Sequence, residues 1–429
     1  MKKQQFLLAL LLLVVACSKS GSGTQKTQSE PPQEQEISIW FISDELETNG
    51  IIKDFNQKYP DIKVNNIIVP NEEYVSKLRT VLRSKKNVPD IFVGEAANVQ
   101  EWVDTDFWDD LPSYPGAEKI ANITPYVRDV GTDRNGIVKA LAWQANPGGV
   151  YYRRSIMEKF FGVSAPEDIS PYFKDMETML QTAAQLKEKS GGEYMLFASP
   201  TDLFQIFFGG KTKNWVSADK RLDIDEDATL LLEAARQIRQ NGYDAKVTHW
   251  TPAWYNTMKQ EGKVAAFYLP PWGLSYLLKL QAPETSGDWG VVAPPKSFFW
   301  GGTWLGIYKD SPNKDAAWKF IEMVTLDTQY SVDFSKRTGG FSANVPAAQQ
   351  IVAEGYRDPF LKDQDTYAFY QEELPKITGK FLTKYDLDIG NIVQSYMETY
   401  ANDVEVSLEA ILKEIKERIQ NLHPDLSIE

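Results

Sequence analysis

Acidic side chains follow two of the strands that the sequence predicts, and their type and position suit ligand binding. Asp44 and Glu45 come soon after the apolar run 37–42, and Glu95 follows the strand candidate 90–93. The carboxyl ends of parallel strands meet at one edge of a sheet, where ligands bind near a topological switch point. We therefore expect these three carboxylates at a ligand cleft.

Motifs for catalysis and for metal binding are incomplete. Residues 210–212 resemble the end of a phosphate-binding loop, but Gln205 stands where that loop requires glycine. Aspartate occupies every second position of residues 223–227, as at the start of an EF-hand calcium loop. Ala228 and Ala234, however, stand where that loop requires a turn glycine and a bidentate glutamate. Two His and one Cys are too few for an ordinary zinc site. We expect no metal, no cofactor and no catalytic centre.

The composition indicates a large acidic body. A chain of 429 residues is long enough for about two domains, each with its own core, so no disulfide framework is needed. Lys and Arg number 46 against 59 Asp and Glu, a net charge of −13. Phosphate backbones require a basic surface, so this balance argues against nucleic-acid binding.

The first seventeen residues predict export and lipid attachment. Two lysines precede the apolar run 6–16, whose eleven residues are too short for the ~30 Å hydrocarbon core of a membrane. Residues 1–16 therefore read as a signal peptide. The ending Val14-Val15-Ala16-Cys17 resembles the lipobox of bacterial lipoproteins, in which the cysteine is acylated. An ordinary cleavage site beside a chance cysteine is the alternative.

A polar segment separates Cys17 from the first strand. Residues 18–36 contain no hydrophobic side chain, so we expect 17–36 to be a disordered, lipid-anchored tether. The body would then lie in the cell envelope, attached to a membrane and facing the periplasm or the extracellular space.

Strands and helices alternate after this tether. Strand 37–42 is followed by helix 50–59, strand 62–69, a helix capped by Asn71 and strand 90–93. This order predicts a mostly parallel sheet covered on both faces. A second α/β stretch follows, with strands at 150–153 and 194–198 and helices at 175–187, 228–240 and 407–419.

Five blocks in order resemble the extracellular solute-binding proteins of family 1, the sugar receptors of ABC importers. They are residues 55–64, residues 88–92, residues 140–143 with 150–153, residues 262–267 with 271–273, and residues 301–307 with 311–321. Residues 171–173 depart from the pattern, because family members commonly have a Thr-Trp pair there.

The resemblance implies an α/β fold of the periplasmic-binding-protein type II, a monomer with two discontinuous lobes that close on ligand like a hinge. The N-terminal lobe would comprise 37–144 and 264–325, and the C-terminal lobe 145–263 and 326–429. The implied partners are a carbohydrate ligand and the permease subunits of the transporter.

The resemblance also implies the ligand-binding residues. A sugar site needs aromatic platforms for C–H faces and polar groups for hydroxyls, because an unpaired buried polar group costs about 1–3 kcal/mol. By position, the candidates are Trp40, Asp44, Glu45, Glu95, Trp143, Gln144, Trp272, Gly301, Gly302 and Trp304. Each candidate also has a structural alternative: Trp40 could belong to the core, and Trp272 could pack the hinge. Asp44 or Glu45 could be helix N-terminal charges, and the two glycines could serve only a turn.

Five further residues have weaker claims. We expect Trp250 and Trp254, four apart on one helix face, to pack in the core, whereas Trp215, Arg337 and Phe341 are candidates for the cleft. Two other functions stay open: a surface glycosidase, since 59 acidic residues always permit some carboxylate pair, and a receptor for a polyamine or peptide.

Overall fold

The computed structural model describes residues 35–428, and its first sheet confirms the predicted parallel strands. The sheet has the order β2-β1-β3-β7, formed by β2 (Ile62–Ile68), β1 (Gln35–Phe41), β3 (Ile91–Glu95) and β7 (Thr303–Ile307). The first three strands run parallel and β7 runs antiparallel to β3. Cys17, the signal peptide and nearly all of the tether lie outside the described residues.

The first core lies between this sheet and its helices. Helices α2 (Ile51–Lys58) and α3 (Asn71–Ser84) connect the parallel strands, and α13 (Lys314–Leu326) packs against β1, β7 and α2. Helix α2 ends before Pro60, as predicted. The predicted cap at Asn71 is wrong, because Asn71 is the first residue of α3 and caps nothing with its side chain.

A second sheet follows, with the antiparallel order β5-β4-β6. It consists of β5 (Ala266–Leu269), β4 (Gly149–Arg153) and β6 (Trp289–Val292). Residues 194–198, predicted as a strand, form only isolated bridges, although Leu196, Phe197 and Ala198 are fully buried.

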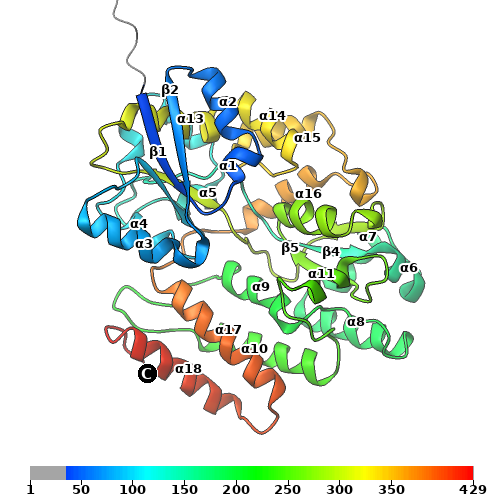
Figure 1. Ribbon diagram of the computed structural model, residues 1–429. Coiled ribbons are helices and arrows are strands. Elements are labelled where there is room, and N and C mark those ends of the chain that lie inside the picture. The colour runs from blue at the N-terminus through cyan, green and yellow to red at the C-terminus, as the bar shows by residue number, and fades with distance from the viewer. Residues whose placement is uncertain (1–34, 429) are drawn as a thin grey trace, which may run out of the picture.

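Helices cover the second sheet and extend beyond it. Predicted helices appear as α8 (Met176–Lys189), α10 (Asp225–Gln240) and α18 (Leu408–Leu422), whose cap Ser407 accepts a hydrogen bond from the Ala410 N–H at 3.2 Å. Helix α17 (Asp386–Asn402) packs between α10 and α18. Figure 1 shows β1 and β2 in the upper part of the molecule and helices α10, α17 and α18 together in the lower part.

The remaining helices are short. They are α1 (Glu45–Thr48), α4 (Gln100–Val103), α5 (Pro125–Val130), α6 (Arg154–Phe161), α7 (Pro166–Ile169), α9 (Phe204–Gly209), α11 (Pro252–Met258), α12 (Pro271–Gly273), α14 (Thr328–Thr338), α15 (Val345–Ala353) and α16 (Thr366–Glu373). None of the helices among residues 35–428 combines the length and the apolar character needed to cross a membrane.

Two segments contact a different sheet from the one to which the expected lobe boundaries assign them. Strands β5 and β6 were expected in the N-terminal lobe, but both pair with β4 of the second sheet. Conversely, buried side chains between Val332 and Leu382 join the core of the first sheet. Strand pairing is nonlocal, so the linear sequence did not reveal these partners. The detailed division into lobes stays a prediction.

Two antiparallel segments connect the sheets. The chain leaves the first core at residues 144–148 and returns at 298–302, and the Trp300 N–H donates to the Asn146 carbonyl at 3.0 Å. Gly148 permits this close approach, because a Cβ there would lie 2.1 Å from the ring of buried Phe298. These segments carry several candidate residues into the region between the sheets.

Candidate ligand-binding site

A cavity of about 370 Å³, here the Glu45 cavity, opens between the two sheets. On the first-sheet side it is lined by Glu45, Thr48 and Asn49, which form or follow the short helix after β1. On the second-sheet side, Trp272 and the π-helical turn Leu274–Lys279 close it. The remaining lining comes from Trp143, Gln144 and Leu280 and from Phe334, Ser335, Arg337, Thr338, Gly340 and Phe341.

A second cavity of about 410 Å³, the Glu95 cavity, also has walls from both sides. The first-sheet side supplies Asn71, Glu95, Ala96 and Ala97, all close to strand ends. The second side supplies residues of α9, α17 and the segment Phe299–Gly301. Its amide side chains, from Asn71, Gln205, Asn391 and Gln394, can both donate and accept hydrogen bonds.

A third cavity of about 620 Å³, the Arg239 cavity, adjoins the second. Both are lined by Gln205, Trp250, Trp300 and Gln394. The third adds the charged side chains of Arg239, Lys246 and Glu398, together with His249. Because the two cavities share these lining residues, they lie next to each other with a common wall.

Three tryptophan rings stand together among the cavities. The Trp250 ring stacks on the Trp272 ring at 6.2 Å and 19° between planes, and both meet Trp300 edge to face, at 6.1 and 5.0 Å. Trp254 packs beneath Trp250 at 5.2 Å and is itself buried. Aromatic faces of this kind are apolar platforms for weakly polar C–H surfaces.

The backbone and a histidine hold Trp250 in this array. Trp250 has a φ of 65°, which is unusual for a bulky residue, and its side chain is 53% exposed. The neighbouring His249 ring stacks on Trp254 and shares a 2.8 Å hydrogen bond with Asp202. Strained, half-exposed residues held by rigid neighbours occur most often at functional sites.

The segment after Phe299 fixes the other two rings. The Trp272 indole N–H donates to the Trp300 carbonyl at 3.0 Å. Gly301 follows with φ of 79°, and a Cβ there would approach the Trp272 indole nitrogen to 3.1 Å. Gly301 therefore allows Trp272 and Trp300 to meet at the cavity wall.

Two of the lining carboxylates are unusual electrostatically. Burial and, to a smaller extent, the negative charge of Glu95 raise the pKa of Glu45 to about 7. Burial likewise raises the pKa of Glu95 to about 7, although Thr303 donates a hydrogen bond to it. The two carboxyls follow adjacent parallel strands and are close enough to repel each other.

Direct contacts bridge the rim of the Glu45 cavity. The Asn49 amide donates to the Tyr276 hydroxyl at 3.2 Å. Arg337 donates to the Asn49 carbonyl at 3.0 Å and to the Asp54 carboxylate at 2.6 Å. The side of the cavity near α1 is thus joined to the second sheet's side and to the end of α14.

Six of the ten predicted site residues line these cavities, and the other four do not. Glu45, Trp143, Gln144 and Trp272 line the first cavity, and Glu95 and Gly301 line the second. Asp44 is exposed at the start of α1, and Trp40 packs against the first core.

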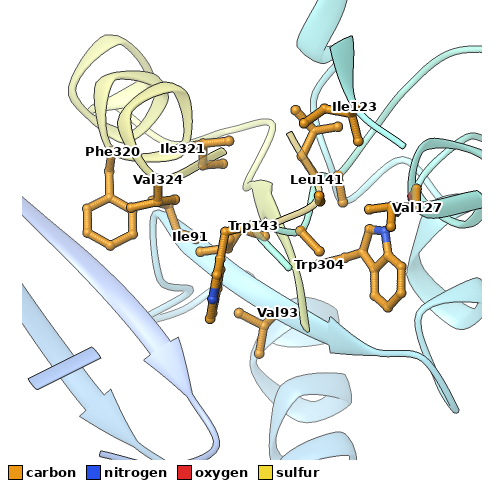
Figure 2. Packing of buried hydrophobic residues seen from close by; sticks show 14 of the residues in the cluster. Ile91, Val93, Ile123, Val127, Leu141, Trp143, Trp304, Phe320, Ile321 and Val324 are labelled. Carbon is orange, nitrogen blue, oxygen red and sulfur yellow. Dashed lines mark hydrogen bonds between the residues drawn. The ribbon is translucent and has the colours of Figure 1, made fainter. Parts of the chain in front are cut away.

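Trp304 and Gly302 have structural roles instead. The Trp304 ring is fully buried and its indole N–H donates to the Val127 carbonyl at 2.7 Å, and Figure 2 shows it beside Val127. Gly302 has φ of 116°, and a Cβ there would lie 2.8 Å from the Trp304 ring. Both residues shape the first core next to the cleft.

Trp143 combines a core position with a cavity wall. Only 5% of the residue is exposed, and its ring stacks on Phe41 at 6.0 Å. Figure 2 shows it among Ile91, Val93 and Val324. Its indole nitrogen is buried without a hydrogen-bond partner, a cost that core packing at this wall has to offset.

Three of the five weaker sequence predictions agree with the structure and two do not. Arg337 and Phe341 line the Glu45 cavity, and Trp254 is core, as expected. Trp215 is fully buried and donates to Asp227 at 3.1 Å, so it does not reach the cleft.

Trp250 was expected in the core, but it lies before α11, which begins only at Pro252. The expected helical pairing with Trp254 therefore does not apply to it. Trp300 was missed altogether, and the only sequence signal for it was its place directly before Gly301-Gly302.

The fold is similar to several solved structures of bacterial binding proteins. An extracellular solute-binding protein of family 1 matches with a TM-score of 0.78 at 17% identity, over 90% of this chain and 99% of that one. The sugar-binding protein MalE of Xanthomonas citri matches with a TM-score of 0.72 at 20% identity, over 90% of this chain and 97% of the other.

A third similar structure contains a bound disaccharide. It is the galacto-N-biose/lacto-N-biose I-binding protein of the Bifidobacterium longum ABC transporter, in complex with lacto-N-biose. The TM-score is 0.72 and the identity 16%, over 93% of this chain and all of that one. These likenesses establish the two-lobed α/β fold expected from the sequence.

A family comparison agrees with the fold. The family described as bacterial extracellular solute-binding protein matches residues 50–365, which include β2, β3 and β7 of the first sheet, the whole second sheet and most of the cavity walls. The chain belongs to the bacterial extracellular solute-binding proteins.

Proposed function

We propose that this chain is the substrate-binding lipoprotein of an ABC transporter, which captures a sugar or oligosaccharide between its lobes and delivers it to the membrane permease. The observation that carries the proposal is the array of Trp250, Trp272 and Trp300 beside the carboxylates Glu45 and Glu95. Aromatic faces suit the C–H faces of a pyranose ring, and carboxylates and amides suit its hydroxyls.

The cavity walls support capture by closure of the lobes. A ligand in the Glu95 cavity can touch Glu95 on one side and Trp250 on the other. Contacts made with both sides at once favour the closed state over the open one, which is a shift of population and requires no chemical step. The protein would therefore bind sugar without converting it.

The adjoining position of two cavities supports an oligosaccharide as the ligand. Trp250 and Trp300 line both the Glu95 cavity and the Arg239 cavity. An oligosaccharide in contact with Trp250 could extend into both cavities. Bound disaccharides in similar proteins agree with this size class, including the lacto-N-biose complex described above.

The lipid anchor is part of the proposal. Acylation of Cys17 would hold the body at a membrane on the tether 17–36. Such attachment keeps the receptor close to the permease, and the acidic body would not itself be attracted to anionic lipid.

Thermal unfolding with a broad panel of neutral and charged mono- and oligosaccharides tests the proposed function. A ligand at one hundred times its Kd stabilises a protein by about 2.7 kcal/mol, which raises the melting temperature measurably. Recovery of the sugar after incubation distinguishes a receptor from a glycosidase. An unchanged melting temperature across the panel, or hydrolysis of a stabilising sugar, would refute the proposal.

A further inference from the structure

The carboxylates of Glu45 and Glu95 have no cationic partner among the described residues. Neither forms an ion pair within 4.0 Å, whereas Arg337 in the Glu45 cavity is paired with Asp54 and Arg239 in the adjoining cavity is paired with Asp244. These two arginines of the cavity walls are therefore neutralised by other carboxylates, and they do not neutralise Glu45 or Glu95.

Hydrogen bonds offset little of their burial. One Glu45 oxygen accepts from the Asn49 amide at 3.3 Å, and one Glu95 oxygen accepts from the Thr303 hydroxyl at 3.4 Å. Both distances are at the long end for hydrogen bonds. Both carboxylates are therefore available to a positively charged ligand group, whose charge would offset the cost of burying them.

The aromatic rings of the same walls favour a cation too. Trp272 lines the Glu45 cavity, and Trp250 and Trp300 line the Glu95 cavity. Tryptophan faces attract ammonium groups within about 6 Å, and they also stack on pyranose rings. A ligand that combines a pyranose ring with an amine would use both properties.

We propose that the ligand is an amino sugar or an oligosaccharide that contains one, with its protonated amine held between the carboxylates of Glu45 and Glu95. The inference rests on the proposed function, because it places the amine on a saccharide bound between the lobes. Glu45 follows β1 and Glu95 ends the adjacent strand β3, and the two cavities that they line meet at the stacked rings of Trp272 and Trp250. Three N–H donors of an ammonium allow it to serve two carboxylates at once.

Titration calorimetry at pH 7 tests this, with glucosamine, galactosamine and glucosamine oligosaccharides of two to four rings. Their N-acetylated forms of equal length are neutral controls. We expect the amine forms that bind to do so at least about tenfold tighter than their acetylated partners, and the preference to weaken in 0.5 M NaCl. Equal or tighter binding of the acetylated forms would overturn the inference and leave the proposed function intact.

Two variants and a matched control place the amine. Glu45→Gln and Glu95→Gln should each reduce the amine preference about tenfold with little effect on the neutral forms. Glu47→Gln changes an exposed glutamate of the same helix that bonds to Asn66 outside the cavities, so it should leave the preference unchanged. Thermal unfolding verifies that each variant is folded.

Two further outcomes separate this inference from the proposed function. A preference that survives both glutamine variants would show that the amine does not lie there. Binding of spermidine in the absence of any saccharide binding would contradict both the amino sugar and the proposed receptor for sugars.

Discussion

Replacing Trp250 by alanine should weaken saccharide binding strongly and leave the fold intact. Trp250 is 53% exposed, whereas the neighbouring Trp254 is buried. A fully covered aromatic side chain buries about 150–250 Å², so about 100 Å² of Trp250 remains for a ligand. At about 25 cal/mol per Å² this corresponds to about 2.5 kcal/mol, or roughly a sixtyfold loss of affinity.

Titration calorimetry with the tightest-binding saccharide measures this loss. Leu422→Ala is the matched control, because Leu422 is exposed to a similar degree, 52%, at the end of α18 and outside the three cavities. Its affinity should equal that of the unmodified protein. An affinity of Trp250→Ala within twofold of the unmodified protein would refute the role of Trp250 as a platform.

Three other predictions concern pH, packing and location. Burial raises the folded-state pKa of Glu45 and of Glu95 to about 7. The free energy of unfolding of the ligand-free protein should therefore fall as pH rises from about 4.5 to 7 and should stay constant above pH 7. Glu95→Gln should flatten this slope in urea unfolding, and an unchanged slope would contradict the raised pKa of Glu95. Gly148→Ala should cost about 1–3 kcal/mol, because the new Cβ would meet the Phe298 ring, and full stability in urea would show that the ring can move away. Cys17→Ala should release a folded, ligand-competent protein from the membrane fraction, and continued retention there would argue against lipid attachment.

Alternating and periodic apolar residues made the first sheet predictable. In β1, Ile37, Ile39 and Phe41 are buried in turn, and the strand ends shortly before Glu45, which lines the cleft. The position of Glu95 followed from the same rule for β3. Strand ends are local features, so the sequence contained the information needed to place these carboxylates near one another.

The lobe membership of β5 and β6 and the role of Trp250 could not be predicted in this way. Pairing of β4 with β5 and β6 joins residues more than one hundred positions apart, and nothing local specifies it. Trp250 is exposed because its backbone is left-handed two residues before α11 begins, while a helical spacing to Trp254 suggested a core position. Trp304 shows the converse error, since only three-dimensional packing reveals that its indole faces Val127.

A crystal structure with the tightest-binding saccharide tests the central claim most directly. The account predicts a pyranose ring stacked on Trp250 or Trp272 between the two sheets, with Glu45 or Glu95 within hydrogen-bond distance of the ligand. A saccharide bound on the outer surface of either lobe, with the three cavities free of it, would contradict the account.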